Sequence, residues 1–270
     1  MRSERRAGNA PSVTAAVIAR DEARNLVDLL PSLRWADEIL VVVDDATSDE
    51  SVAVSEQLAD HVVLEPFTSF PSFRNRALEI ATGQWVFFID ADERVSDRLI
   101  DEVLQRVAAS EAGLTSGDSR APVGYWVPRN NLMFGRLIRG GGWSPDYQMR
   151  LFRRGSARYD PTRHVHEKVQ LGGPEGFLSE RLLHFNYATL GQFFAKQEVY
   201  TSMEAAALRA QGYQARARSL IGEPVREFLR RYVILGGWRD GPVGLFLSIA
   251  MAYFALRRTI TLRSRDTAQS

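Results

Sequence analysis

The sequence predicts an α/β protein with a doubly wound, mostly parallel sheet and a helical extension at its C-terminus. Short apolar, β-prone runs alternate with segments of helical periodicity in the first half of the chain. This pattern is typical of parallel strands joined by crossover helices. From about residue 187 the periodicity is helical throughout. We therefore expect a disordered tail over residues 1–11, an α/β domain over 12–186 and a helical region over 187–270.

Four apolar runs and the periodic segments between them predict the elements of the first half. The expected strands are residues 13–19, 38–43, 61–65 and 84–89. A helix is expected after each strand, and one face of the first helix carries Leu26, Leu29, Leu30 and Leu33. Residues 111–123 have the composition of a loop. Two further strands, 124–129 and 147–154, are expected on either side of a glycine-rich loop.

Acidic residues cluster where three of the expected strands end. The clusters are Asp21-Glu22, Asp44-Asp45 and Asp90-Asp92-Glu93. Ligands of such sheets gather beyond the carboxyl ends of the strands. Helix N-caps also favour aspartate, which accounts for Asp49 and Asp97 but poorly for three clusters at one edge. The sequence therefore predicts a binding site at this edge.

Asp90 and Asp92 lie one residue apart just after a buried strand, so both carboxylates can reach one hard cation. Mg²⁺ or Mn²⁺ takes oxygen ligands and often keeps substrate phosphate oxygens in its shell. A metal held there would neutralise charge that builds up on a diphosphate. A helix N-cap or a solvated turn is the alternative explanation. The position after a buried strand favours the metal site.

Three segments together resemble the family 2 glycosyltransferases of the GT-A fold: "VIARDEARNL", "WADEILVVVDDATSDES" and "RNRALEIATGQWVFFIDADE". They match in order and spacing, with "FIDADE" at the family's D-x-D. The resemblance extends through "PDYQMRLFRRG", "HVHEKV" and the basic tail, a longer pattern similar to the lipopolysaccharide core or lipid-glycan branch. Ala46 departs from the family pattern, because glycine is usual there and a positive φ would strain alanine.

The resemblance implies transfer of a sugar, with inversion, from a nucleotide-diphosphate donor, for which UDP is favoured on family grounds. It implies that Asp44 hydrogen-bonds the donor base or ribose, with help from Arg20 and Glu22 in the preceding loop. It also implies that Asp90 and Asp92 hold the metal and the diphosphate. A turn-forming side chain is the alternative role of Asp44.

Asn75 and Arg76 stand where the resembled family often contacts the nucleotide through a basic or amide side chain. The resemblance therefore implies that both bind the nucleotide sugar. A solvated helix face is an equally good explanation of the two residues.

An inverting transfer needs a base within hydrogen-bond reach of the acceptor hydroxyl and positive charge on the leaving diphosphate. By the resemblance, the base is Glu167 in "HVHEKV", and Asp146, at the end of the glycine-rich loop, is the rival candidate. His166 would bind metal, steady the diphosphate or orient Glu167. The sequence leaves these roles open, and a structural histidine is the alternative.

Composition limits the classes of protein and of partner. The chain has 270 residues with 45% hydrophobic content, which supports a substantial core, and it has no cysteine for disulfide or thiolate chemistry. Residues 1–120 carry 12 Lys/Arg against 22 Asp/Glu, and the remainder carries 22 against 11. The acidic half suits a cation and the basic half an anionic substrate or membrane surface. Two surfaces that attract each other are the alternative.

The C-terminal region predicts association with a membrane surface. Residues 226–235 place Phe228, Leu229 and Tyr232 near one side and arginines near the other, as in helices that lie in an anionic interface. The apolar stretch 242–256 is shorter than the roughly 20 residues that span a bilayer. We expect a cytoplasmic protein, peripheral on the inner face of the cytoplasmic membrane. A dimer interface or an ordinary core is the alternative, so a homo-oligomer remains open.

These observations favour a metal-dependent glycosyltransferase that extends a lipid-linked glycan acceptor such as lipopolysaccharide core. A nucleotidyltransferase or sugar-nucleotide pyrophosphorylase is a second hypothesis, but such enzymes usually carry a glycine-rich phosphate loop that "VIARDEARN" lacks. A non-catalytic, membrane-bound binding module is a third. No nucleic-acid partner is expected, because the basic residues are interspersed with apolar ones and no such motif is present.

Overall fold

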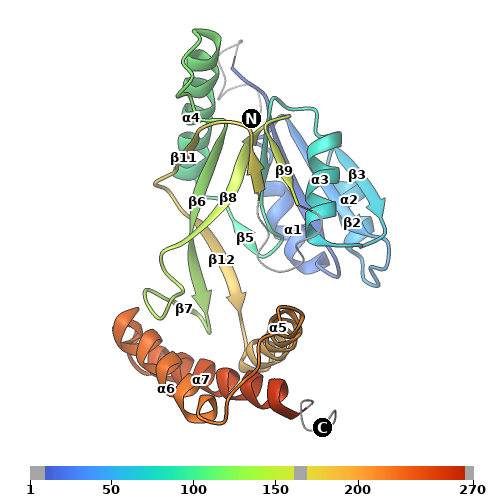
Figure 1. The fold of residues 1–270 in the computed structure, drawn as a ribbon. Coiled ribbons are helices and arrows are strands. Elements are labelled where there is room, and N and C mark those ends of the chain that lie inside the picture. Colours follow the sequence, from blue (N-terminus) through green and yellow to red (C-terminus); the bar gives the residue numbers. More distant parts are fainter. Residues whose placement is uncertain (1–9, 161–168, 265–270) are drawn as a thin grey trace. The chain divides into compact units, whose positions relative to one another are not determined.

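A computed structural model describes residues 10–160 and 169–264 of the chain (Figure 1). The chain divides into two compact units, which we call the sheet unit and the helical unit. Within the described ranges, the sheet unit takes its residues from 1–129 and 147–184, and the helical unit from 130–146 and 185–270. The helical unit thus includes a segment that precedes its helices by some forty residues in the sequence.

One mixed sheet carries the fold, in the order β3-β2-β1-β4-β8-β6-β12-β5, with β7 and β11 paired to β6. Its strands are β1 Val13–Ala19, β2 Glu38–Asp44, β3 His61–Glu65, β4 Trp85–Phe88, β5 Glu93–Arg94, β6 Gly124–Met133, β7 Arg136–Leu137, β8 Asp146–Arg153, β11 Glu175–Phe177 and β12 Leu182–Tyr187. The first four strands are parallel, and β8 is antiparallel to β4. The prediction of an α/β fold with a mostly parallel first half is confirmed.

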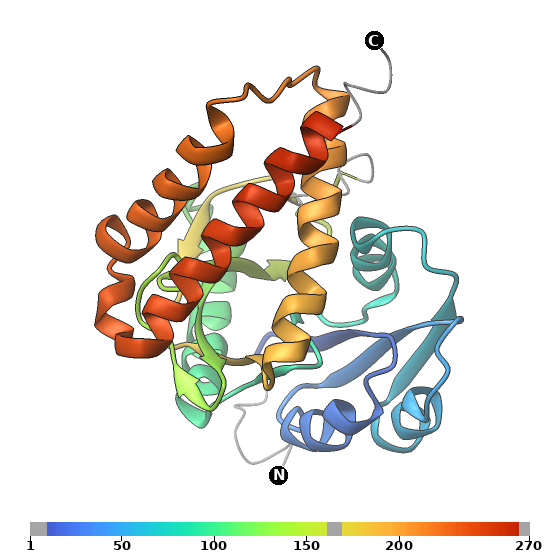
Figure 2. The same cartoon turned by 90° about the horizontal axis from the view of Figure 1, so that it is seen from below.

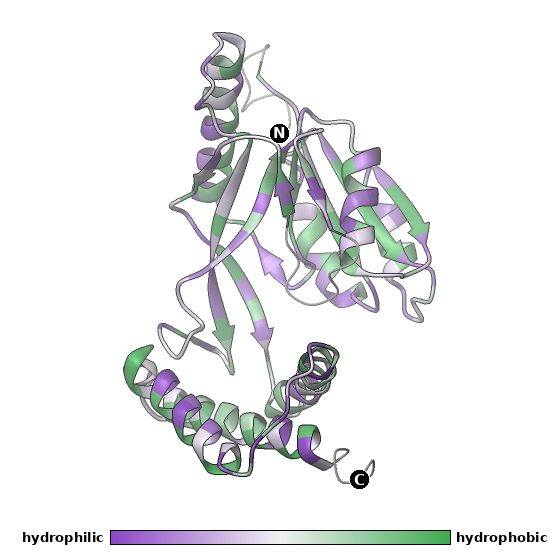
Figure 3. Cartoon of the chain, in the orientation of Figure 1, coloured by the Kyte–Doolittle hydropathy of each residue, from purple (hydrophilic) through white to green (hydrophobic). Residues whose placement is uncertain are grey.

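Helices cover both faces of the parallel strands. They are α1 Ala23–Ser32, α2 Ser51–Leu58, α3 Phe70–Ile80 and α4 Asp97–Thr115. Successive side chains of a strand point to opposite faces. Accordingly, Ala15 and Val17 of β1 pack in a core with α1, α2 and α4, whereas Ala16 packs in a second core with α3. In Figure 3 these strands are coloured largely green, which marks hydrophobic residues. The expected doubly wound arrangement is therefore confirmed.

The observed elements differ from the expected ones mainly where a helix ends later than expected or where a strand is very short. Ser69 and Ser96 accept backbone N–H bonds at the starts of α3 and α4, which satisfies donors that a helix leaves unpaired. Helix α4 continues to Thr115, so the loop expected from residue 111 begins later. Strand β5 is only two residues long, and β9 (Ala157–Tyr159) pairs with β10 (Val169–Leu171) outside the main sheet. Elements of this length leave no periodic signal.

The helical unit contains α5 Leu190–Ala210, α6 Ser219–Leu229 and α7 Gly241–Ser264. A π-helical turn, Arg230–Ile234, continues α6. Helix α7 packs against both α5 and α6 (Figure 2). Their core includes Met133 and Ile138 from the 130–146 segment, together with Phe193, Leu247 and Phe254 of α5 and α7. Burial of this apolar surface holds residues 130–146 against the helices.

Two glycines allow close approaches inside the helical unit. A Cβ on Gly140 would collide with the carbonyl oxygen of Gly236, and one on Gly244 would collide with that of Gly237. The predicted glycine-rich loop, residues 139–146, therefore packs closely against the turn before α7. The position of Gly140 leaves no room for a side chain at this contact.

One helical segment in the described part of the chain, Gly237–Ser264, is long and apolar enough to cross a membrane. This corrects the expectation from residues 242–256 alone, because the helix extends beyond that apolar run on both sides. Part of its surface is buried against α5 and α6, where Leu247, Ala250 and Phe254 are almost inaccessible.

Candidate active site

The three acidic clusters do lie at one edge of the sheet. Strand β1 lies between β2 and β4, and all three are parallel. Arg20 follows the end of β1, Asp44 is the last residue of β2, and Asp90 follows β4 by one residue. Strand order therefore gathers segments that are as much as 70 residues apart at the carboxyl ends of adjacent strands, where ligands of open α/β sheets bind.

Asp44 is 1% exposed and organises the turn after β2. Its Oδ1 accepts a hydrogen bond from the N–H of Ala46 at 3.0 Å, and its carbonyl accepts one from Thr47. Arg20 Nη1 lies 3.1 Å from Oδ2, without hydrogen-bond geometry. The turn-forming alternative is therefore present in the structure. Ala46 does not have a positive φ, so the strain expected from its replacing glycine does not arise.

The loop after β1 is tied to the loop after β2. Asp21, at φ 53°, accepts the N–H of Ser48 at 2.7 Å. The N–H of Glu22 donates to Ser51 Oγ at 2.8 Å, and the Glu22 carboxylate accepts from the Asn25 amide at 2.6 Å. These bonds fix the backbone beside Arg20 and Asp44, and they give the Glu22 carboxylate a partner within the protein.

Asp90 lies in a network of three arginines and Glu93. Arg150 Nη1 donates to Asp90 Oδ1 at 3.0 Å, and its Nη2 contacts the other carboxylate oxygen and lies 3.1 Å from Glu93 Oε1. Arg129 Nη1 donates to Glu93 at 3.1 Å, and Arg74 Nη2 lies 3.5 Å from Asp90. Burial raises the pKa of Asp90, but Arg150, Arg74 and Arg129 lower this pKa by a larger amount. The net pKa is below the usual value, so the carboxyl stays ionised.

Among the described residues, three guanidinium groups meet two carboxylates in this network. Arg150 is 3% exposed at its side chain; burial lowers its pKa, but Asp90 and Glu93 raise it by more. The Arg74 guanidinium lies over the rings of Phe88 and Tyr159, 5.5 Å from each centroid. Guanidinium groups are therefore concentrated beside the strand end, an arrangement that suits binding of a diphosphate.

Asp92 faces a histidine that the sequence did not single out. Its Oδ2 lies 3.3 Å from Nε2 of His184, which is buried on β12. Antiparallel pairing of β12 with β5 sets His184 opposite Glu93 and so brings it to Asp92. The only signal in the sequence was a lone histidine in the apolar run "RLLHFNY", at a distance of 92 residues.

The structure gives Asn75 and Arg76 partners within the protein. The Asn75 amide donates to the Tyr159 carbonyl at 2.9 Å and accepts from the Tyr159 N–H at 2.8 Å, which holds β9. Arg76 bonds Glu65 at 2.6 Å and is 43% exposed at its side chain. Nucleotide contact by either residue remains a prediction.

Of the two candidate bases, Asp146 lies among the described residues and Glu167 does not. Glu167 and the neighbouring His166 lie outside the described residues. Asp146 belongs to the helical unit, where its Oδ2 accepts a hydrogen bond from the Asn131 amide at 3.0 Å. Asn131 also donates to the Trp143 carbonyl at 2.7 Å, so Asp146 is held by the folded glycine-rich loop.

Asp92 and His184 are the described side chains best placed to take a metal ion. No group of three or more His, Cys, Asp or Glu within residues 10–160 and 169–264 is arranged to hold one. The pair offers one oxygen and one nitrogen donor, which suits Mn²⁺ or Mg²⁺ if further ligands come from elsewhere. Asp90 fits the role less well, because arginines occupy both of its carboxylate oxygens.

Residues 14–162 match the family described as Glycosyl transferase family 2, and the chain belongs to this family. The match contains β2 to β4, all of β1 except Val13, and the described residues around Asp44 and Asp90. His184 lies outside it. The protein is therefore a glycosyltransferase.

Curated relatives align with nearly the whole length of the chain. "Lipopolysaccharide core biosynthesis glycosyltransferase LpsC" of Rhizobium meliloti is 29% identical and aligns over 96% of this chain and 94% of its own. An "Uncharacterized glycosyltransferase" of Rickettsia felis is 24% identical over 96% of both chains. Among solved structures, S. aureus TarS 1–349 in complex with UDP-GlcNAc is 13% identical and covers 93% of this chain and 83% of its own, with a TM-score of 0.45.

Proposed function

We propose that the protein transfers a sugar, with inversion, from a nucleotide-diphosphate donor to a lipid-linked glycan acceptor such as lipopolysaccharide core. UDP is the favoured donor nucleotide. The gathering of Asp44, the arginine network and Asp92 at the carboxyl ends of β1, β2 and β4 carries this proposal. Family membership supports the reaction class, and the similarity to LpsC supports the acceptor class.

In this proposal Asp44 and Arg20 bind the nucleoside, and the arginines beside Asp90 bind the diphosphate. Asp90 acts through Arg150, because both of its carboxylate oxygens are engaged with arginines. The positive groups are in place before the donor binds. Such preorganised positive charge stabilises the leaving diphosphate, which carries one more negative charge than it did in the donor.

Asp92 and His184 would hold the divalent metal ion. The ion would act as a Lewis acid on the diphosphate oxygens. Their separation of 3.3 Å allows both to bind a single ion without a change in β12 pairing. Asp92 then has a role distinct from that of Asp90, although both belong to one D-x-D.

Glu167 remains the proposed base, and Asp146 is the alternative. The base takes the proton of the acceptor hydroxyl while the hydroxyl oxygen attacks the anomeric carbon and the bond to the diphosphate breaks. Its identity can be tested by kinetics, because loss of the base lowers kcat far more than it weakens binding of the donor.

The helical unit supports a membrane-peripheral position on the cytoplasmic side. Ile221, Val225, Leu229 and Val233 recur every four residues along α6 and the turn after it, and each is 48% exposed or more. We call these four residues the α6 stripe. A row of exposed apolar side chains next to arginines is typical of a helix in an anionic interface. Arg231 is a correction to the predicted basic face, because it turns inward to the Gly141 carbonyl and the Trp143 ring.

The reaction class can be tested by product analysis. The purified full chain is incubated in one reaction with UDP-sugars, Mn²⁺ and deacylated or native lipid-linked glycan, and in a second with UTP, sugar 1-phosphates and Mn²⁺. The products of both reactions are separated by mass. A glycosyltransferase releases UDP and adds one sugar to the glycan, whereas a nucleotidyltransferase consumes UTP and a sugar 1-phosphate and releases pyrophosphate. Release of pyrophosphate without any sugar transfer would contradict the proposal.

A further inference from the structure

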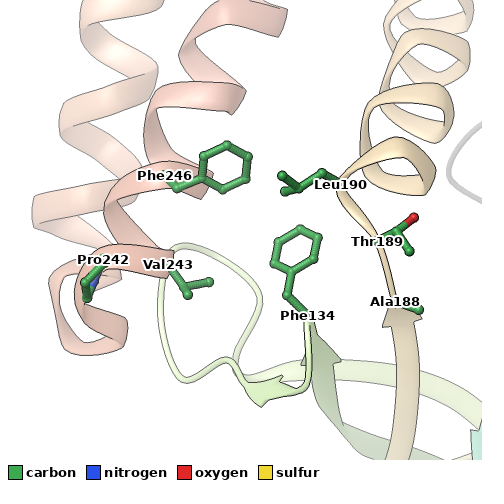
Figure 4. Close-up of a pocket in the computed structure, with 7 residues that line it drawn as sticks. All are labelled: Phe134, Ala188, Thr189, Leu190, Pro242, Val243 and Phe246. Carbon is green, nitrogen blue, oxygen red and sulfur yellow. The ribbon is translucent and has the colours of Figure 1, made fainter.

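Two adjoining pockets of the helical unit are not explained by sugar transfer. The first, of about 430 Å³, is lined mainly by apolar side chains that include Phe134, Leu190, Val243 and Phe246. In Figure 4 the side chains of Phe134, Leu190 and Phe246 converge on one space, from the β6–β7 turn, the start of α5 and α7. The volume is within the range of small-molecule sites.

The second pocket, of about 500 Å³, is lined by three arginines, Arg136, Arg139 and Arg239. No carboxylate among the described residues pairs with any of them. Asp240 also lines the pocket, but its two oxygens accept the N–H groups of Arg139 and Gly140, each at 2.8 Å. Three positive charges and one negative leave the lining at +2, and the first turn of α7 adds the positive end of a helix dipole.

The two pockets meet at Pro242 and Val243, which line both. A cationic pocket beside an apolar one, with two lining residues in common, matches a molecule with an anionic head and a hydrocarbon chain. A small anion would leave the apolar pocket open to water, and a neutral hydrocarbon would leave the arginines unpaired. The chemistry of the combined site is therefore amphiphilic.

The backbone at Phe134 is a separate observation at the same site. Phe134 has φ 53° in the turn between β6 and β7, a conformation that is unfavourable for a bulky residue. Its ring lies 6.1 Å from that of Phe246 and 6.2 Å from that of Phe193. Asparagine or glycine would fit such a turn better, so an aromatic side chain is retained there against local preference, and it lines the apolar pocket.

We propose that these pockets bind a single lipid molecule with a phosphate headgroup, the phosphate at the three arginines and one acyl chain beside Phe134, Leu190 and Phe246. Guanidinium groups bind phosphate through charge-assisted, often bidentate hydrogen bonds. The inference concerns binding alone and does not depend on the proposed donor or acceptor. It is also distinct from contact of the α6 stripe with a bilayer.

The test is calorimetric titration of the full chain, without nucleotide sugar, using short-chain lipids below their micelle concentration. Dihexanoyl phosphatidic acid is the probe, and dihexanoyl phosphatidylcholine and inorganic phosphate are the comparisons. We expect phosphatidic acid to bind about tenfold more tightly than either, since phosphatidylcholine carries no net negative charge and inorganic phosphate carries no acyl chain. Equal binding of phosphatidylcholine or of inorganic phosphate would overturn the proposal.

Variants locate the site. Arg139→Gln/Arg239→Gln should weaken phosphatidic acid binding about tenfold or more, and Leu190→Gln should weaken it without changing the affinity for inorganic phosphate. Arg216→Gln/Arg218→Gln and Val199→Gln remove exposed charges and an exposed apolar side chain elsewhere in the same unit and should change nothing. Arg136→Gln/Arg139→Gln is a second headgroup variant, and all variants are checked by their unfolding midpoints. Unchanged affinity in both arginine pairs would refute the assignment.

Discussion

Arg150 is the residue on which the buried charges of the site depend. It bonds Asp90 and lies 3.1 Å from Glu93, which is inaccessible to solvent. Removal of one partner from a buried ion pair leaves an uncompensated charge in a poorly solvated place. The proposed donor site and the stability of the sheet unit therefore depend on the same guanidinium group.

Replacing Arg150 with methionine should lower the free energy of unfolding by about 1–3 kcal/mol, because Asp90 loses two charge-assisted hydrogen bonds and Glu93 keeps only Arg129. Urea unfolding at pH 7 measures the change. Arg98→Met is the matched control, since Arg98 is exposed on α4 and its loss should be within about 0.5 kcal/mol. Equal effects of the two substitutions would show that the network does not stabilise the fold.

The ionised state of Asp90 gives a dependence of stability on pH. Its pKa is lowered in the folded protein, so its contribution is fully present above the unfolded pKa of about 3.9 and is lost as pH falls toward the folded value. Asp90→Asn should therefore be less stable than the wild type at pH 7, and the difference should narrow below about pH 4. Urea unfolding across pH 3–7 tests this, and a constant difference would contradict it.

At the scale of the element, strand β12 supplies a side chain to the proposed metal site, and helix α6 supplies side chains to the proposed membrane contact. Strand β12 carries His184 to Asp92 through a two-residue pairing with β5. Helix α6 has an apolar face that packs on α7 and a second apolar face, the α6 stripe, that remains exposed. An exposed stripe of this length is a candidate surface for contact with lipid.

The double substitution Ile221→Gln/Val225→Gln should reduce binding to anionic vesicles by about tenfold or more, since full burial of each such side chain is worth about 1.5–3 kcal/mol. Co-sedimentation with phosphatidylglycerol vesicles measures it. Leu64→Gln removes a comparably exposed leucine from β3 and should bind as the wild type does. Equal vesicle binding by the stripe variant and the wild type would exclude the stripe as the contact.

At the scale of the whole molecule, charge is divided along the chain. The first 120 residues carry an excess of ten acidic residues, and the remainder an excess of eleven basic ones. The arginine network lies within the sheet unit despite the acidic bias of its sequence, since Arg129 and Arg150 come from the basic part. Metal and donor that bind only the folded protein should raise its free energy of unfolding by mass action.

Saturation with UDP and Mn²⁺ should raise the free energy of unfolding by about 2.7 kcal/mol at a hundredfold excess over Kd. Asp92→Asn and His184→Gln should each lose the part of this gain that requires Mn²⁺ while keeping the part that UDP gives alone. A thermal-shift series with and without Mn²⁺ measures both parts. Retention of the full Mn²⁺-dependent gain by both variants would remove Asp92 and His184 as metal ligands.

The sequence by itself determined the α/β architecture, because alternating apolar runs and amphipathic helices fix which faces must be buried. It also placed Asp44, Asp90 and Asp92 at the carboxyl ends of strands, since strand ends are visible in composition. It could not show that arginines occupy both oxygens of Asp90, or that His184 reaches Asp92, because those contacts join residues 60 and 92 positions apart through strand pairing. The inward turn of Arg231 and the paired pockets beside α7 likewise depend on how helices and loops pack, which local periodicity does not encode.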